Sequence, residues 1–280
     1  MKIIKFTGDN MKKTVYLTFR FKSMLVCVLA FLLGIASVLL VFSGSTSASA
    51  ETSGAVYENT VPLTIIIDAG HGGEDGGTQS SDGTLEKDIN LQISLKLEKL
   101  LKLMGYNTVM VRSEDKLIYS GNPDKMREKK VSDLNNRLEI AEAYPDAIFI
   151  SIHQNYFTES RYSGAQVFYS PNSEKSQLLA QCIQRSVVSL VQPENERKIK
   201  KSGSEIFLLD KIESPAVMVE CGFMSNPSEA LLLRDGEYQK KTVLAIANGI
   251  TEYRLLLQEA KQWHRSQKQY MYAIANTVFF

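Results

Sequence analysis

The feature that most constrains the fold of this chain is a regular alternation of strand-like and helix-like segments after residue 62. Short apolar runs rich in β-branched residues occupy residues 63–68, 106–111, 147–152, 165–169 and 216–220. Longer segments with helical character occupy residues 87–104, 132–143, 173–191 and 237–257. Such alternation is typical of α/β proteins. The sequence therefore predicts one α/β domain, with a mixed or mostly parallel twisted sheet and helices on both faces.

The first of these helical segments carries a conflicting pattern. Apolar residues alternate strictly from Ile89 to Leu97, as in a strand. The apolar residues at 89, 93, 97, 100, 101 and 104 also fit helical spacing, and Gly105 suits a helix end. The run is also longer than a typical strand. We therefore expect a helix.

Four side chains stand at the ends of strand-like runs or at the start of the first helix. They are His71, Glu86, His153 and Glu220. In α/β enzymes the crevice beyond the carboxyl ends of the strands is where functional side chains gather. Two histidines and one glutamate form a recurrent catalytic zinc set that leaves a coordination position open for water. The sequence predicts a hydrolase in which His71, Glu86 and His153 hold one Zn²⁺ and Glu220 acts as a base, although Glu220 could instead cap a helix.

The residues around His71 indicate how such a site would be supported. Glycines at 70, 72 and 73 allow a sharp turn after the strand. Asp68 and Asp75 are candidates to orient an imidazole through its second nitrogen. An ordinary polar residue at a strand end is an equally good interpretation of Asp68.

The N-terminal 62 residues have a different character from the rest of the chain. Basic residues precede an apolar run over 24–42, and Ala48-Ser49-Ala50 follows, which is the pattern of a secretory signal. The apolar run is also nearly long enough for an uncleaved membrane anchor. We expect residues 1–50 to be a signal peptide or anchor, residues 51–62 a linker, and the catalytic part to be extracytoplasmic, secreted or membrane-anchored. A start at Met11 instead of Met1 would give a more ordinary signal.

Charge composition argues against one class of function, and two basic segments have two possible interpretations. The formal net charge of +1 argues against nucleic-acid binding. The basic residues of 113–130 and of 192–204 are expected in solvated loops, or alternatively on a cleft rim that contacts an anionic polymer. Cys182 and Cys221 lack CxxC spacing, and we favour free thiols over a disulfide between them. The tail, residues 258–280, receives no predicted role.

Four stretches of the chain resemble the zinc-dependent N-acetylmuramoyl-L-alanine amidases of the Amidase_3 type. They are residues 68–77 (DAGHGGEDGG), 86–88 (EKD), 151–155 (SIHQN) and 220–226 (ECGFMSN). The resemblance implies a zinc amidase domain over residues 63–257, with the same three zinc ligands and Glu220 as the catalytic carboxylate. It also marks Asn155 and Arg137 as candidate supporting or substrate-contacting residues.

Two further stretches, residues 162–169 (YSGAQVFY) and 225–230 (SNPSEA), are similar to the germination-specific, spore-cortex amidases of endospore-forming bacteria. That similarity implies cleavage of the bond between N-acetylmuramic acid and L-alanine of peptidoglycan during cortex synthesis, leading to muramic-δ-lactam. It also implies a location that includes the forespore intermembrane space. Because no wall-binding repeat is visible, an accessory protein for targeting or activation is expected. The alternatives are a zinc carboxypeptidase or endopeptidase acting on wall peptides, and a non-catalytic wall-binding protein.

Overall fold

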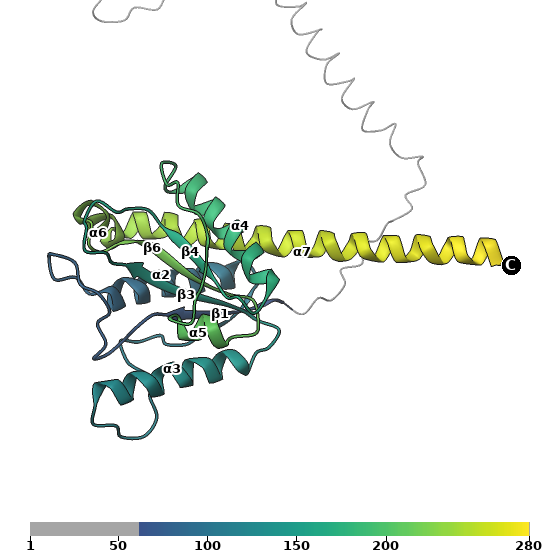
Figure 1. The fold of residues 1–280 in the computed structure, drawn as a ribbon. Coiled ribbons are helices and arrows are strands. Elements are labelled where there is room, and N and C mark those ends of the chain that lie inside the picture. Colours follow the sequence, from purple (N-terminus) through teal and green to yellow (C-terminus); the bar gives the residue numbers. More distant parts are fainter. Residues whose placement is uncertain (1–61, 280) are drawn as a thin grey trace, which may run out of the picture. The chain divides into compact units, whose positions relative to one another are not determined.

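A computed structural model of the chain describes residues 62–279, with side chains described to residue 269 (Figure 1). The expected signal peptide or anchor, and all but the last residue of the expected linker, lie outside the described residues. The described part is an α/β fold built on one sheet.

The sheet has six strands in the order β2-β1-β3-β6-β4-β5. The strands are β1 (Thr64–Ala69), β2 (Asn107–Met110), β3 (Ile148–Asn155), β4 (Gln166–Tyr169), β5 (Lys200–Lys201) and β6 (Ala216–Phe223). Strands β2, β1, β3 and β6 are parallel, and β4 runs antiparallel to β6. The predicted mixed, mostly parallel sheet is confirmed.

The strand β1 shows why these segments read as continuous apolar runs. Ile65 and Ile67 lie in a core on one face of the sheet, and Ile66 lies in the core on the other. All three are fully buried. A strand covered on both faces needs apolar residues at successive positions, so the period of two disappears from its sequence.

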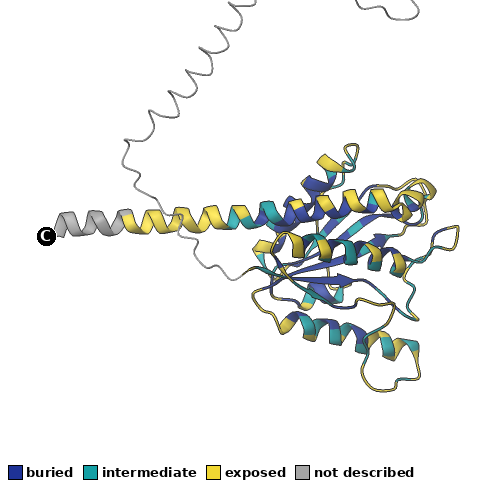
Figure 2. Cartoon of the chain, turned by 180° about the vertical axis from the view of Figure 1, so that it is seen from behind, coloured by how far each residue is buried: buried dark blue, intermediate teal, exposed yellow. Residues whose placement is uncertain are grey.

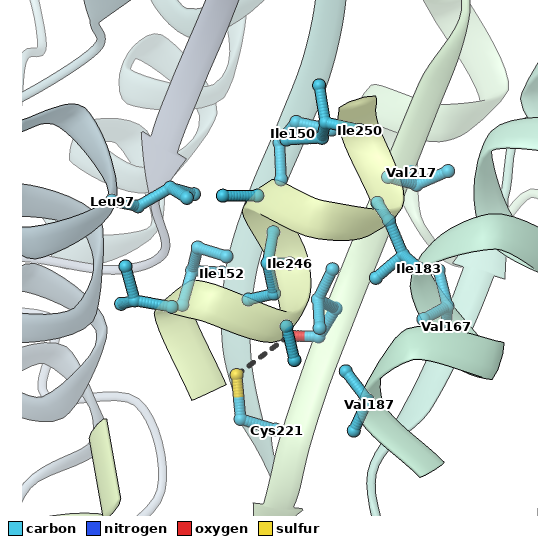
Figure 3. Close-up of a cluster of buried hydrophobic side chains, with 14 of the residues drawn as sticks. Leu97, Ile150, Ile152, Val167, Ile183, Val187, Val217, Cys221, Ile246 and Ile250 are labelled. Atoms are coloured by element: carbon cyan, nitrogen blue, oxygen red, sulfur yellow. Dashed lines mark hydrogen bonds between the residues drawn. The ribbon is translucent and has the colours of Figure 1, made fainter. Parts of the chain in front are cut away.

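Helices cover both faces of this sheet, as predicted (Figure 1). On one face lie α2 (Glu86–Leu103), α4 (Glu174–Leu190) and α7 (Gly236–Phe279). On the other lie α3 (Met126–Glu142) and α5 (Phe207–Lys211). Figure 3 shows the larger core, where Ile246 and Ile250 of α7 lie in one cluster with Ile150 and Ile152 of β3 and Val217 of β6. This burial of aliphatic side chains fixes the sheet that carries the polar residues described below.

Several boundaries differ from those predicted. The helix α3 begins at Met126, so much of the basic stretch expected in a loop is helical. The short elements β5, α5 and α6 (Pro227–Arg234) were not predicted. Strands β3 and β6 continue past the predicted ends at 152 and 220, to Asn155 and Phe223. Helix α7 does not end at 257 but continues to Phe279.

The C-terminal part of α7 extends away from the sheet and its described side chains are mostly exposed (Figure 2). Tyr253 is still buried, whereas Trp263 is 61% exposed. Among the described residues, no helix is both long and apolar enough to cross a membrane. Cys182 and Cys221 are both free and buried in the larger core, as favoured from the sequence.

Candidate metal centre

A tight turn after β1 presents His71. Its φ of 60° places this residue in the left-handed region, which residues other than glycine rarely adopt. Gly70, just before it, lies against the imidazole of His153, and a Cβ at this position would be 2.2 Å from His153 Nε2. The absence of a side chain at Gly70 therefore lets β1 and β3 bring their two histidines together.

The structure gathers the three predicted zinc ligands into one cluster. His71 Nε2 lies 3.3 Å from Glu86 Oε2, and His153 Nδ1 lies 3.0 Å from Glu86 Oε1. One ligand atom from each residue falls within 4.8 Å of the other two. Residues far apart in the sequence thus form a group that could hold a metal ion.

The carboxylate of Glu86 is buried and held by several donors. The backbone N–H groups of Thr78 and Gln154 donate to it at 2.9 and 3.1 Å, and Asn90 Nδ2 donates at 3.2 Å. Burial opposes ionisation, but the hydrogen bonds from the two histidines keep the pKa of Glu86 well below its ordinary value. Sequence reasoning missed Thr78 and Asn90. Asn90 could have been found, because it lies one helical turn after Glu86 on the same face.

Asp75 orients the imidazole of His71, as predicted for one of the two aspartates. Asp75 Oδ2 lies 2.8 Å from His71 Nδ1, and its other oxygen pairs with Lys130 at 2.8 Å. Burial lowers the pKa of His71, but the hydrogen bonds to Asp75 and Glu86 outweigh it and raise the pKa to about 9. The contact with Asp75 leaves Nε2 of His71 directed at Glu86.

Within the described residues, Asp68 forms no hydrogen bond with an imidazole. It is buried and accepts hydrogen bonds from Ser151 Oγ, at 2.7 Å, and from the guanidinium of Arg137. Arg137 in turn donates to the carbonyl oxygens of Ala69 and His71, at 3.0 and 2.8 Å. Asp68 and Arg137 therefore hold the backbone of the turn that carries His71, and this gives Arg137 a structural role that the sequence left open.

Arg112 is a second buried arginine that supports the same turn. Its Nε donates to the carbonyl oxygen of Ala69 at 2.8 Å, and its Nη2 donates to that of Gly70 at 2.9 Å. Its side chain is only 2% exposed. Sequence reasoning missed this residue, although an arginine that directly follows the apolar strand-like run at 106–111 is a visible signal.

Glu220 lies beside the cluster on the neighbouring strand. It is in register with His153 across the parallel pair β3–β6, so the two side chains project from the same face. Glu220 Oε2 is buried and has no hydrogen-bond partner among the described residues. Burial raises the pKa of this carboxyl to about 7. Such a group can accept or give a proton near neutral pH.

Asn155 lies further along β3, after a bulge between His153 and Asn155. Its carbonyl oxygen accepts a hydrogen bond from Met224 N at 2.8 Å, which ties the end of β3 to β6. No side-chain hydrogen bond joins Asn155 to the cluster within the described part of the chain. Its predicted supporting or substrate role stays a prediction.

The donor set fits a catalytic zinc ion. Two imidazole nitrogens and one carboxylate oxygen are directed toward one another, and an unsatisfied carboxylate oxygen lies on the adjacent strand. The contact with Glu86 helps to hold a proton on the imidazole of His71, whose pKa is raised to about 9. A cation bound at this nitrogen would replace that proton.

Comparison with known proteins identifies the family of this chain. Residues 65–252 match the family model of the N-acetylmuramoyl-L-alanine amidases, Amidase_3. A Bacillus subtilis protein named germination-specific N-acetylmuramoyl-L-alanine amidase is 32% identical over 228 residues, which is 80% of this chain and 93% of that protein.

Solved structures give the same result. The CwlD amidase from Clostridioides difficile, in complex with the GerS lipoprotein, is 41% identical with a TM-score of 0.67, over 69% of this chain and 99% of that one. The amidase AmiC2 of Nostoc punctiforme is 28% identical with a TM-score of 0.60, over 69% of this chain and 97% of that one.

The fold and these matches therefore define a peptidoglycan hydrolase of the α/β class. The chain belongs to the N-acetylmuramoyl-L-alanine amidase family, Amidase_3, and has the activity of that family.

Proposed function

We propose that the amidase activity depends on one zinc ion held by His71, Glu86 and His153, with Glu220 as the catalytic carboxylate, in a catalytic domain spanning residues 63–257. The observation that carries the proposal is the convergence of these three ligand groups beside an unsatisfied carboxylate oxygen. When bound, zinc would act as a Lewis acid on the scissile carbonyl and would lower the pKa of bound water to near 7.

The residues of the chain perform the remaining tasks. Asp75 fixes the imidazole of His71, and the donors around Glu86 keep its carboxylate ionised and in place. Glu220 takes the proton of the attacking water and passes it to the nitrogen of L-alanine as the amide bond breaks. Its raised pKa, about 7, suits a group that must both accept and release a proton.

We further propose a role in spore cortex synthesis that leads to muramic-δ-lactam. The support is the name of the Bacillus subtilis relative, a germination-specific amidase, and the 41% identity to the CwlD amidase. The enzyme would then act outside the cytoplasm, in the forespore intermembrane space, delivered by residues 1–50 as a signal peptide or membrane anchor.

An accessory protein is part of this proposal. The CwlD amidase of Clostridioides difficile was solved in complex with a lipoprotein, GerS. Recovery of bound proteins from membranes, with the full chain and with a chain lacking residues 1–50, tests this part. Recovery of no specific partner with either chain would refute it.

Digestion of intact peptidoglycan by the protein with added zinc tests the reaction itself. The expected products by mass spectrometry are free stem peptides beginning with L-alanine, together with unbroken glycan strands. Cleavage within the peptides would instead favour the endopeptidase or carboxypeptidase alternative. Digestion without added zinc after chelation should give no product.

Two substitutions separate the proposed ligands from the base. Glu220→Gln should retain one zinc ion per chain and lose about 10²- to 10⁴-fold in turnover, the range for loss of a general base. His153→Ala should lose both zinc and turnover. Loss of zinc from Glu220→Gln would show that Glu220 is a ligand and not the base.

A further inference from the structure

The segment between α4 and β5 brings a cation to the edge of the site. In this segment Arg197 Nη2 donates to Gln166 Oε1 at 2.5 Å, and Gln166 Nε2 donates to the carbonyl oxygen of Lys198 at 2.8 Å. The backbone N–H of Arg197 donates to Asn195 Oδ1 at 3.0 Å. These contacts hold the guanidinium in one place on β4, unlike a solvated loop residue.

The position of Gln166 relates Arg197 to the catalytic residues. Gln166 is in register with Glu220 on the antiparallel pair β4–β6, and Glu220 is in register with His153 on β3–β6. Three residues on adjacent strands therefore lie in one row across the sheet. They are His153 on β3, the proposed metal ligand; Glu220 on β6, the proposed base; and Gln166 on β4, the partner of Arg197. Adjacent strands are about 4.8 Å apart, so each step along this row is short.

The guanidinium is fixed and yet incompletely paired. Its CZ atom lies 4.9 Å from the ring centroid of Phe223, which holds it by a cation–π contact. Its Nε is buried without a hydrogen-bond partner among the described residues. Burial is the main influence on the pKa of Glu220 and raises it, while the charge of Arg197 acts in the opposite direction, which agrees with their proximity.

The reaction geometry indicates which part of the substrate would pass this point. A carboxylate that delivers a proton to the leaving amine must lie on the side of that amine. The peptide continues from the amine, and the strand order places β4 and Arg197 on the side of Glu220 that lies away from His153. Two residues of extended peptide span at most about 7 Å, which brings the residue after L-alanine to the guanidinium.

We propose that Arg197 is a specificity-determining residue of the amidase that binds a free carboxylate on the stem peptide, at the residue that follows L-alanine. A planar guanidinium suits a carboxylate, and Phe223 and Gln166 fix the orientation of this one. This inference rests on the proposed role of Glu220, because that role sets the direction in which the peptide leaves the metal.

The test measures kcat/KM on soluble peptidoglycan fragments whose residue after L-alanine carries either a free α-carboxylate or a carboxamide. Arg197→Gln should lose about 10- to 100-fold on the carboxylate substrate, the range for a hydrogen bond to a charged group. It should lose less than about threefold on the carboxamide substrate. Arg197→Lys, which keeps the charge without the fork, should fall between the wild type and Arg197→Gln on the carboxylate.

Arg161 provides the matched control. It also lies over an aromatic ring, that of Tyr162 at 5.4 Å, but it is 75% exposed and paired with Glu159. Arg161→Gln should match the wild type on both substrates. Equal losses of Arg197→Gln on the two substrates would mean that Arg197 acts through Glu220 or the fold, and no loss on the carboxylate would also overturn the proposal.

A separate result decides whether the underlying site is wrong. If Glu220→Gln kept full turnover, the proposed role of Glu220 as the base would be wrong. The activities of Arg197→Gln on the carboxylate and carboxamide substrates would still show whether Arg197 recognises the peptide.

Discussion

Replacement of Arg137 by methionine is expected to destabilise the protein severely. Methionine is similar in length but cannot donate, so the buried carboxylates of Asp68 and Asp133 lose their common partner. Two carbonyl oxygens of the His71 turn lose a donor as well. Breaking a buried ion pair from one side costs about 3–5 kcal/mol.

Urea unfolding of the zinc-free protein measures this cost directly. With a slope of about 2–3 kcal/mol per molar, as for a domain of this size, the midpoint of Arg137→Met should fall by about 1–2.5 M. The exposed pair Arg185–Glu252 supplies a control, because Arg185→Met breaks an ion pair of 2.5 Å that lies at the surface. That variant should lose at most about 0.5 kcal/mol.

The dependence on pH provides a second check. Burial raises the pKa of Asp68, but Arg137 and Ser151 outweigh burial and lower it below the ordinary 3.8. The stabilisation is therefore complete above that ordinary value and is lost as pH falls toward the lowered pKa. The difference between wild type and Arg137→Met should be full at pH 7 and narrow below about pH 4. A cost under about 1 kcal/mol at pH 7, or a difference that stays constant into acid, would refute the reasoning.

Three further predictions concern the cluster itself. Gly70→Ala should abolish zinc binding in equilibrium dialysis, because a Cβ 2.2 Å from His153 Nε2 must displace that imidazole; unchanged affinity would contradict the packing. Asp75→Asn should weaken zinc binding about 10- to 100-fold by isothermal titration, as expected when a group that orients a ligand is lost, and an unaltered affinity would count against that role. Zinc affinity should fall as pH decreases below about 9, the raised pKa of His71, because zinc must displace that proton; a flat profile between pH 6 and 9 would show that His71 is not a ligand.

The sequence predicted the fold and the position of the central residues because their signals are local. Continuous apolar strands ending near His71 and His153 identify a sheet buried on both faces and the edge where its polar residues gather. A glutamate at the start of a helix, Glu86, is similarly visible. The structure brings these three residues together as predicted.

The supporting contacts could not be predicted in the same way. Arg112 and Arg137 donate to backbone carbonyl oxygens far away in the sequence. Every residue has a backbone carbonyl, so the pattern of side chains in the sequence does not indicate which carbonyl will be the partner. The interpretation of Asp68 as a group that orients an imidazole was wrong for this reason: its partners, Arg137 and Ser151, become neighbours only when the sheet and α3 have packed. The end of α7 was also misplaced, because the expected stop at 257 coincides with loss of burial and not with a helix-breaking residue.

The register of β3 and β6 has a consequence for how this enzyme can be altered. His153 and Glu220 lie side by side on adjacent hydrogen-bonded strands. Their spacing is therefore set by the sheet and does not depend on the polypeptide that connects them. That connection, residues 156–215, contains β4, α4, β5 and α5. Loops within it can be lengthened, shortened or exchanged while the distance between the proposed ligand and the proposed base stays constant. The proposed reaction centre and the proposed peptide-binding residue, Arg197, thus lie in separable parts of the chain, and a designer could change the second while the first stays unchanged.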